Sequence, residues 1–122
     1  MSDYRELKVY EKSYEAAKMV YIISKGMPQS EQFGLTSQIR RASTSVPLNI
    51  AEGYGKQAGD KEVLRFLQMA RGSSVEMQVL VNMLKDFGYI SDEVYKETIN
   101  QYEEIGKMIS GLMKSIKLKT SD

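Results

Sequence analysis

The chain has no cysteine and no histidine, and these two absences exclude most of the chemistry that small helical proteins perform. Without cysteine there is no disulfide and no thiolate metal site, which agrees with a reducing compartment. Without histidine the commonest general base is missing, and the Glu-x-x-His pairs of di-iron helical bundles cannot occur. We therefore expect a protein that is not an enzyme and that carries no cofactor and no metal ion.

An excess of charge and long apolar runs are also lacking. Lys and Arg number 17 against 16 Asp and Glu, so the net charge of +1 gives no overall attraction to nucleic acid or to an anionic membrane. No apolar stretch approaches the ~20 residues that span a bilayer, and the amino-terminal residues mix charges instead of forming the apolar core of a signal peptide. We expect a soluble, cytoplasmic protein in which any basic site is local.

Helical periodicity runs along nearly the whole sequence. Apolar residues recur every three or four positions, and no run alternates with the period of two that is typical of a half-buried strand. Breaks at Gly26 to Pro28, around Gly59 and at Gly88 divide the pattern into four segments. The sequence predicts one all-α domain over residues 1–122, an antiparallel up-down-up-down four-helix bundle whose tail frays from Lys117.

Each predicted helix carries one apolar seam that we expect to face the core. The seams are Leu7, Tyr10, Tyr14, Ala17, Tyr21 and Ser24; Leu35, Ile39, Ala42, Val46, Ile50 and Tyr54; Val63, Leu67, Ala70, Ser74, Met77, Val81 and Leu84; and Tyr95, Thr98, Tyr102, Ile105, Ile109, Leu112 and Ile116. Further apolar residues fall beside these seams: Val9, Met19, Ile23, Phe66, Met69, Leu80, Met83, Ile99, Met108 and Met113. They indicate either a second apolar surface used for self-association or a wide core in a monomer.

Pro47 lies inside the pattern of the second helix. Its ring presses on the carbonyl of Ser43 and it has no N–H to donate, so we expect a kink in a single continuous helix. The hydroxyls of Ser43, Thr44 and Ser45 can occupy the freed backbone groups, and their small size lets another helix approach closely.

A polar stripe follows the same helix. Arg41, Ser45, Asn49, Glu52 and Lys56 recur at helical spacing, and the third helix adds further polar groups. The stripe can form ion pairs at helix and subunit interfaces, or it can line up in an oligomer as a basic surface for phosphates. The candidate residues for either role are Arg40, Arg41, Asn49, Glu52, Lys56, Arg65 and Arg71.

Several segments together resemble the signature of the 23S rRNA intervening-sequence protein family of bacterial four-helix bundles. They are FGLTSQIRRA at 33–42, SVP at 45–47, NIAEG at 49–53 and the stretch from Arg-Phe-Leu to Ala-Arg-Gly-Ser at 65–73. The resemblance implies an antiparallel bundle assembled as a ring, a homopentamer, and an association with RNA. Members of this family are encoded within the extra segments that interrupt some 23S rRNA genes, and also at other loci.

Two functional hypotheses follow. In the first, the protein is a non-catalytic oligomeric adaptor that binds structured RNA, such as rRNA, or a ribonucleoprotein through clustered Arg40, Arg41, Lys56, Arg65 and Arg71. In the second, it is a homo-oligomeric protein-interaction scaffold with no direct nucleic-acid contact, and its arginines serve the assembly. A hydrolase is the least supported alternative, because the usual bases and nucleophiles are missing.

Overall fold

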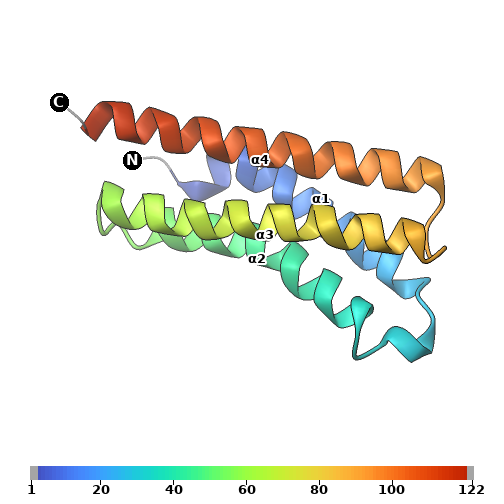
Figure 1. Cartoon of the computed structure of the whole chain (residues 1–122). Coiled ribbons are helices and arrows are strands. Elements are labelled where there is room, and N and C mark those ends of the chain that lie inside the picture. Colours follow the sequence, from blue (N-terminus) through green and yellow to red (C-terminus); the bar gives the residue numbers. More distant parts are fainter. Residues whose placement is uncertain (1–2, 121–122) are drawn as a thin grey trace.

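The computed structural model describes residues 3–120, which form a bundle of four long helices (Figure 1). The helices are α1 (Lys8–Lys25), α2 (Leu35–Gly55), α3 (Asp60–Asp86) and α4 (Asp92–Thr120), with short 3-10 turns η1 (Tyr4–Glu6) and η2 (Gln29–Glu31). No strand occurs among these residues, so the predicted all-α class is confirmed. None of the helices in residues 3–120 combines the length and the apolar character of a membrane span.

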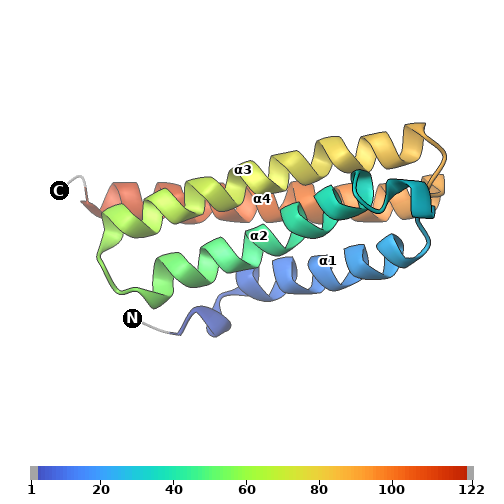
Figure 2. The same ribbon diagram turned by 90° about the horizontal axis from the view of Figure 1, so that it is seen from below.

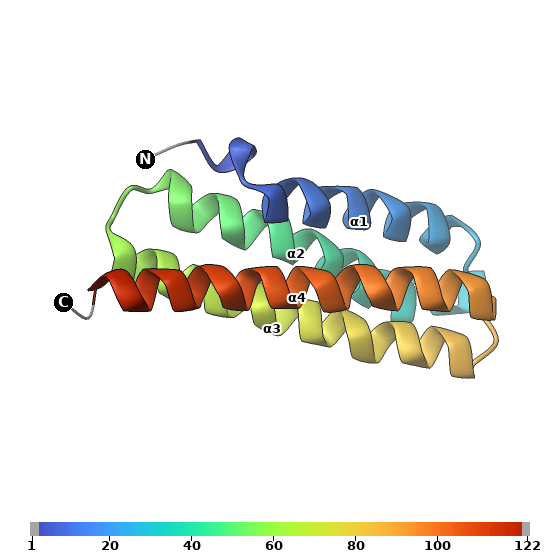
Figure 3. The same cartoon turned by 90° about the horizontal axis from the view of Figure 1, so that it is seen from above.

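Successive helices run antiparallel and lie side by side, as Figures 2 and 3 show. α2 packs most extensively against α3, α3 packs against α4, and α1 closes the bundle by contacting both α2 and α4. The diagonal pairs, α1 with α3 and α2 with α4, make no close backbone contact within the described chain. This arrangement confirms the predicted up-down-up-down topology.

The core consists of the seams predicted for α2, α3 and α4, with a few additions. The α3 seam is buried throughout, and Ile39, Ala42, Val46 and Ile50 of α2 are completely enclosed. In α4 the core is centred on Tyr102, Ile105 and Ile109, while Leu112 and Ile116 are half-buried. Four of the residues beside the seams widen this core: Val9, Phe66, Leu80 and Met113.

The seam predicted for α1 is correct only in part, because Ala17 and Ser24 are buried but two of its tyrosines are not. Val9, Ala16 and Val20 face the core, whereas Tyr14 and Tyr21 are 51% and 41% exposed. A shift of one residue turns a helix by about 100°, so two apolar stripes offset by one position compete for the core. The stripe of smaller side chains is buried because it lets α1 lie close to the neighbouring helices. The tyrosine stripe can stay outside because a tyrosine hydroxyl is well solvated by water.

α2 continues through Pro47 without interruption, which confirms one helix across the proline. The nearby hydroxyls form hydrogen bonds to a carbonyl one turn before the one that Pro47 frees. Ser43 Oγ donates to the Arg40 carbonyl at 3.2 Å, and Thr44 Oγ1 donates to the same carbonyl at 2.8 Å. Ser45 Oγ instead meets Ser73 Oγ of α3 at 2.7 Å, so small size does allow a close approach. The kink at Pro47 stays a prediction.

The connection from α3 to α4 ends one helix and starts the next as the sequence indicates. Gly88, with φ 81°, donates its N–H to the Lys85 carbonyl, and Tyr89 donates to the Leu84 carbonyl, which together form a Schellman motif. Ser91 Oγ then accepts the Val94 N–H at 3.1 Å and caps α4. At its other end α4 continues past Lys117 to Thr120, and the predicted fraying there stays a prediction.

Candidate functional site

The predicted polar stripe of α2 lies against a matching polar stripe of α3. Arg41 of α2 forms an ion pair with Glu76 of α3. One to two turns along, Ser45 Oγ bonds Ser73 Oγ, and Asn49 Nδ2 donates to the carbonyl and the hydroxyl of Ser45 at 2.8 and 2.9 Å. The stripe therefore joins two helices of the same chain.

At the end of α2, two cations share one aromatic ring. Lys56 Nζ lies 4.8 Å from the centroid of the Phe66 ring, and the Arg65 guanidinium carbon lies 4.4 Å from it. Lys56 also pairs with Glu52 at 3.5 Å, and Arg65 pairs with Glu62 through two hydrogen bonds of 3.0 Å. The hydrogen bond from Arg65 lowers the pKa of the Glu62 carboxyl, and the same contact raises the pKa of Arg65.

We call this whole surface the α2–α3 polar face. Its members are Arg41, Ser45, Asn49, Glu52, Lys56, Glu62, Arg65, Ser73 and Glu76. Three cations and three carboxylates stand on it, and every cation has a carboxylate partner. A neutral, internally paired face exerts little attraction on phosphates, and exposed pairs of this kind stabilise a fold only slightly.

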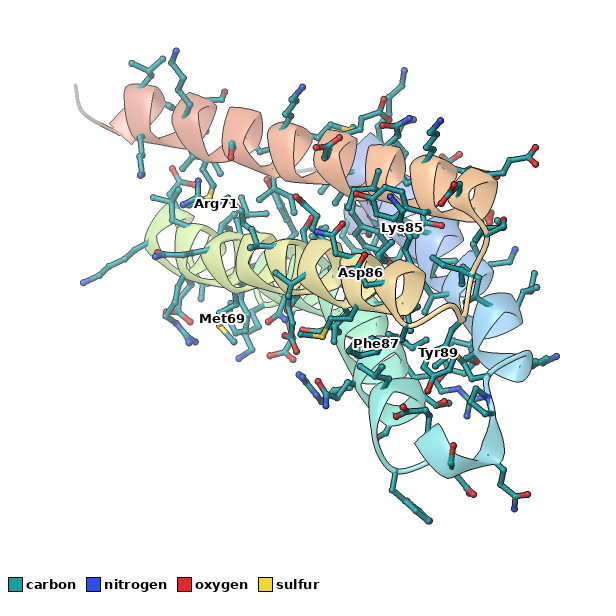
Figure 4. All side chains as sticks on the ribbon, turned by 45° about the vertical axis from the view of Figure 1, so that its right-hand side comes forward. Met69, Arg71, Lys85, Asp86, Phe87 and Tyr89 are labelled. Carbon is teal, nitrogen blue, oxygen red and sulfur yellow. The ribbon has the colours of Figure 1, made fainter. Side chains whose placement is uncertain are left out.

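The other two predicted arginines lie elsewhere. Arg40 is half-buried against α1, where its Nε donates to Ser24 Oγ at 2.9 Å and its guanidinium carbon lies 5.1 Å from the Tyr21 ring centroid. Arg71 projects from α3 into the space beside α4, on the side of α3 away from Met69 (Figure 4). The candidate residues therefore divide among three surfaces, and only Arg41, Asn49, Glu52, Lys56 and Arg65 come together.

Arg71 belongs to a basic groove between α3 and the carboxyl-terminal half of α4. Its Nη1 donates to Ser110 Oγ at 3.2 Å. The groove has a volume of about 460 Å³ and is lined by Arg71, Ser110, Met113, Lys114, Lys117 and Leu118. None of these lining residues is acidic, in contrast to the α2–α3 polar face.

Lys114 and Lys117 of this groove, and Lys107 two turns before Lys114, were not among the residues selected from the sequence. Lys107, Lys114 and Lys117 follow one another by seven and three positions, which places them on one side of a helix. No Asp or Glu occurs from Ile105 to Thr120. This local run of one charge sign was the available signal, and the near-zero net charge of the whole chain concealed it.

A larger apolar groove lies on the outside of α1 and α2, and we call it the tyrosine groove. It has a volume of about 660 Å³ and is lined by Tyr4, Tyr10, Tyr14, Ala17, Lys18, Tyr21, Ile22, Lys25, Thr44, Pro47, Leu48 and Ala51. Ile22 and Leu48 are 65% and 63% exposed within it. Sequence reasoning missed this surface because it assigned the α1 tyrosines to the core.

A second exposed apolar surface, the α3 apolar stripe, consists of Val75, Val79, Met83 and Phe87. Each is separated from the next by four residues, and all are exposed. Figure 4 shows Phe87 at the end of α3 beside Tyr89, and their rings meet edge to face at a centroid distance of 6.3 Å. Tyr89 in turn donates to Glu31 at 2.9 Å, which ties this end of the bundle to the α1–α2 connection.

The described residues contain no cluster of three or more acidic side chains that could hold a metal ion. What the surfaces offer is binding: two apolar areas, one neutral polar face and one basic groove.

Comparison with protein families decides where this bundle belongs. The family described as 23S rRNA-intervening sequence protein matches residues 5–111. The chain belongs to this family. Lys114 and Lys117 lie beyond the matched residues, whereas all the candidates selected from the sequence lie within them.

A solved structure supports the same fold for the 23S rRNA-intervening sequence protein family. It is the 1.70 Å crystal structure of a protein of unknown function from the S23 ribosomal protein family of Bacteroides thetaiotaomicron VPI-5482. The two chains are 25% identical, with a TM-score of 0.79, over 87% of this chain and 95% of that chain. A comparison with the curated proteins found no match.

Proposed function

We propose that this member of the 23S rRNA-intervening sequence protein family is a non-catalytic oligomeric adaptor that binds structured RNA or a ribonucleoprotein. The observation that carries the oligomeric part is the pair of exposed apolar surfaces, the tyrosine groove and the α3 apolar stripe. Apolar surfaces of this kind on a small domain are typical of interaction sites.

The placement of these surfaces favours a ring. One surface lies on α1 and α2 and the other on α3, and α1 and α3 occupy diagonal corners of the bundle. Docking one surface of each copy into the different surface of the next makes a head-to-tail contact, which closes into a ring when the rotation fits. The homopentamer implied by the family resemblance is the ring size to test.

The RNA part of the proposal is supported by the family description and by the basic groove beside α4. Arg71, Lys114 and Lys117 line this groove, and none of the described residues that line it with them is acidic. Copies of this groove repeated around a ring would add their attraction for phosphates, because linked sites raise the effective concentration of one another. Arg41, Lys56 and Arg65 are less suited to this role because each is already paired.

That pairing favours the second candidate, a protein-interaction scaffold with no nucleic-acid contact. Three of the five arginine and lysine residues selected as phosphate ligands, Arg41, Lys56 and Arg65, are neutralised by carboxylates of the same chain. In this case the cations serve the bundle and its assembly, and partners are proteins.

RNA binding separates the two candidates. Fluorescence anisotropy with a labelled 23S rRNA hairpin is expected to show binding whose log affinity falls with log salt by roughly 0.7 to 0.9 per phosphate contacted. Absence of binding at low salt would reject the adaptor and leave the scaffold.

Substitutions on the two apolar surfaces test the ring. Ile22→Glu in the tyrosine groove and Val79→Glu on the α3 apolar stripe each place a charge in a proposed contact, so each is expected to reduce the oligomer to smaller species in light scattering. Asn100→Glu is the matched control, since it adds the same charge at an exposed position of α4 outside both surfaces. Retention of the full mass by both apolar-surface variants would contradict this contact.

A further inference from the structure

The charges of α4 are segregated along its length. The first half contains Asp92, Glu93, Glu97, Glu103 and Glu104 against Lys96 alone, while the second half contains Lys107, Lys114, Lys117 and Lys119 and no acid up to Thr120. Lysine near a helix carboxyl terminus interacts favourably with the helix dipole, but that effect falls off within the last turn. The dipole therefore accounts for Lys117 and Lys119, and Lys107 follows Glu103 by four residues, a spacing that stabilises a helix. Lys114 has neither explanation.

Arg71 of α3 lines the same groove as Lys114 and Lys117, whereas Lys107 lies outside this lining, two turns before Lys114 on the same side of α4. Arg71 is half-buried and donates from Nη1 to Ser110 Oγ, which leaves most of the five N–H donors of its guanidinium available. No carboxylate within residues 3–119 forms an ion pair with Arg71, Lys107 or Lys114. These three cations differ in this respect from Arg41, Lys56 and Arg65 of the α2–α3 polar face.

The cations form a row. At a rise of 1.5 Å per residue, Lys107 and Lys117 lie about 15 Å apart along the axis of α4. One isolated phosphate needs donors that converge on a point, whereas a row of this length can contact more than one phosphate along a nucleic-acid strand. Ser110 lies between the lysines and adds a hydroxyl to the row.

Within the part of the chain that the structure describes, no aromatic side chain lines the groove. Single-stranded bases bind largely by stacking on aromatic rings, and the residues that contribute most to protein contacts are enriched in Trp and Tyr as well as Arg. A groove with cations, one hydroxyl and the apolar side chains of Met113 and Leu118 can contact phosphates but has little with which to read bases.

We propose that Arg71, Lys107, Lys114 and Lys117, here called the α3–α4 basic strip, bind the phosphodiester backbone of RNA without reading its sequence. This inference rests on the proposed adaptor function and names the surface that performs it. It differs from the expectation drawn from the sequence, because Arg71 alone belongs to the candidates selected there and Lys114 and Lys117 lie outside the family match.

The test compares two double variants with the same change in net charge, from +1 to −1. Lys107→Gln with Lys114→Gln removes two cations of the strip, and Lys61→Gln with Lys96→Gln removes two exposed lysines elsewhere. All four positions are exposed, so neither variant disturbs the core. Binding of two labelled hairpins, one from 23S rRNA and one of unrelated sequence, is measured by anisotropy over a range of salt concentrations.

The strip variant is expected to bind both hairpins about 10-fold more weakly. Its salt slope is expected to fall by about 1.5, because each lysine removed releases one phosphate and each phosphate contributes roughly 0.7 to 0.9. The control variant should bind like the wild type. Equal binding by both variants, or equal weakening of both, would overturn the strip and leave the adaptor function standing.

Two further outcomes would reject the adaptor function or the assignment of these lysines to RNA. If the wild type binds neither hairpin at low salt, the adaptor function fails and the strip fails with it. If the strip variant has a lower mass than the control in light scattering, these lysines contact another copy, for which the acidic first half of α4 is a complementary surface, and the RNA assignment is wrong. Arg71→Gln gives an independent check, because it should weaken RNA binding while the mass of the oligomer is unchanged.

Discussion

Replacement of Gly53 by alanine tests how closely α2 and α3 pack. A Cβ atom at this position would lie 2.8 Å from Cβ of Phe66 and 3.6 Å from Cα of Val63. Carbon atoms in contact prefer about 3.5 to 4.0 Å, so the two helices must separate by about 1 Å or Phe66 must move. Both neighbours are fixed close to the α3 backbone, and neither can rotate away as the end of a flexible side chain could.

The expected cost follows from two opposing effects. Adding a methyl group to a tightly packed contact costs about 1 to 3 kcal/mol. Alanine in place of glycine inside a helix returns about 0.5 to 1 kcal/mol. We expect Gly53→Ala to lower the free energy of unfolding by about 1 kcal/mol, which corresponds to a Tm lower by about 4 °C for a chain of this length.

Urea unfolding followed by circular dichroism, at one fixed protein concentration, measures this difference. Gly111→Ala is the matched control, because no described heavy atom beyond its own helical backbone and chain neighbours lies within 4 Å of the added Cβ, and it also stands inside a helix. The control should gain about 0.5 to 1 kcal/mol. If Gly53→Ala is as stable as Gly111→Ala, the close α2–α3 contact does not exist.

Three other changes have defined outcomes. Tyr102 is completely buried without a hydrogen-bond partner for its hydroxyl, and burial raises its pKa above the ordinary 10.0. Tyr102→Phe should therefore add about 1 kcal/mol in urea unfolding at neutral pH and flatten the loss of stability above pH 10.0, since only the unfolded chain releases that proton readily. A double-mutant cycle of Arg41→Ala and Glu76→Ala should give a coupling of at most about 1 kcal/mol, because both side chains are partly exposed; a coupling above about 3 kcal/mol would contradict a surface pair. Arg40→Ala removes a half-buried hydrogen bond to Ser24 and should cost about 2 kcal/mol in thermal unfolding, whereas a cost below about 0.5 kcal/mol would show that this hydrogen bond does not stabilise the packing of α1 on α2.

The sequence predicts the fold well because its helices carry long seams at regular spacing. The α3 seam from Val63 to Leu84 is buried at every position of the seam. Gly88, which has a positive φ of 81°, follows the end of α3 as a glycine at this point predicts. Periodicity is only partly correct for α1 because two apolar stripes are offset by one residue. Spacing alone does not say whether a stripe of tyrosines or a stripe of alanine, serine and valine is buried. Which stripe is buried depends on how closely the neighbouring helices approach α1.

The candidate site is only partly predictable for a different reason. The spacing of Arg41, Asn49 and Lys56 correctly indicates one face of α2. Whether the cations of this face are neutralised depends on which carboxylates lie beside them in the folded chain. Glu62 and Glu76 pair with the cations of this face, and their positions follow from the packing of α2 on α3. The lysines of α4 were detectable from the sequence as a run without acids, but Arg71 is brought beside them only by the fold.

The mass of the purified chain in solution tests the central claim most directly. Light scattering over a wide range of concentrations is expected to show an assembly several times the 13.9 kDa of one subunit, with five copies as the expected number. The tyrosine groove and the α3 apolar stripe are then covered in the assembly. A single subunit of 13.9 kDa at high concentration would contradict the account, because both apolar surfaces would remain in water.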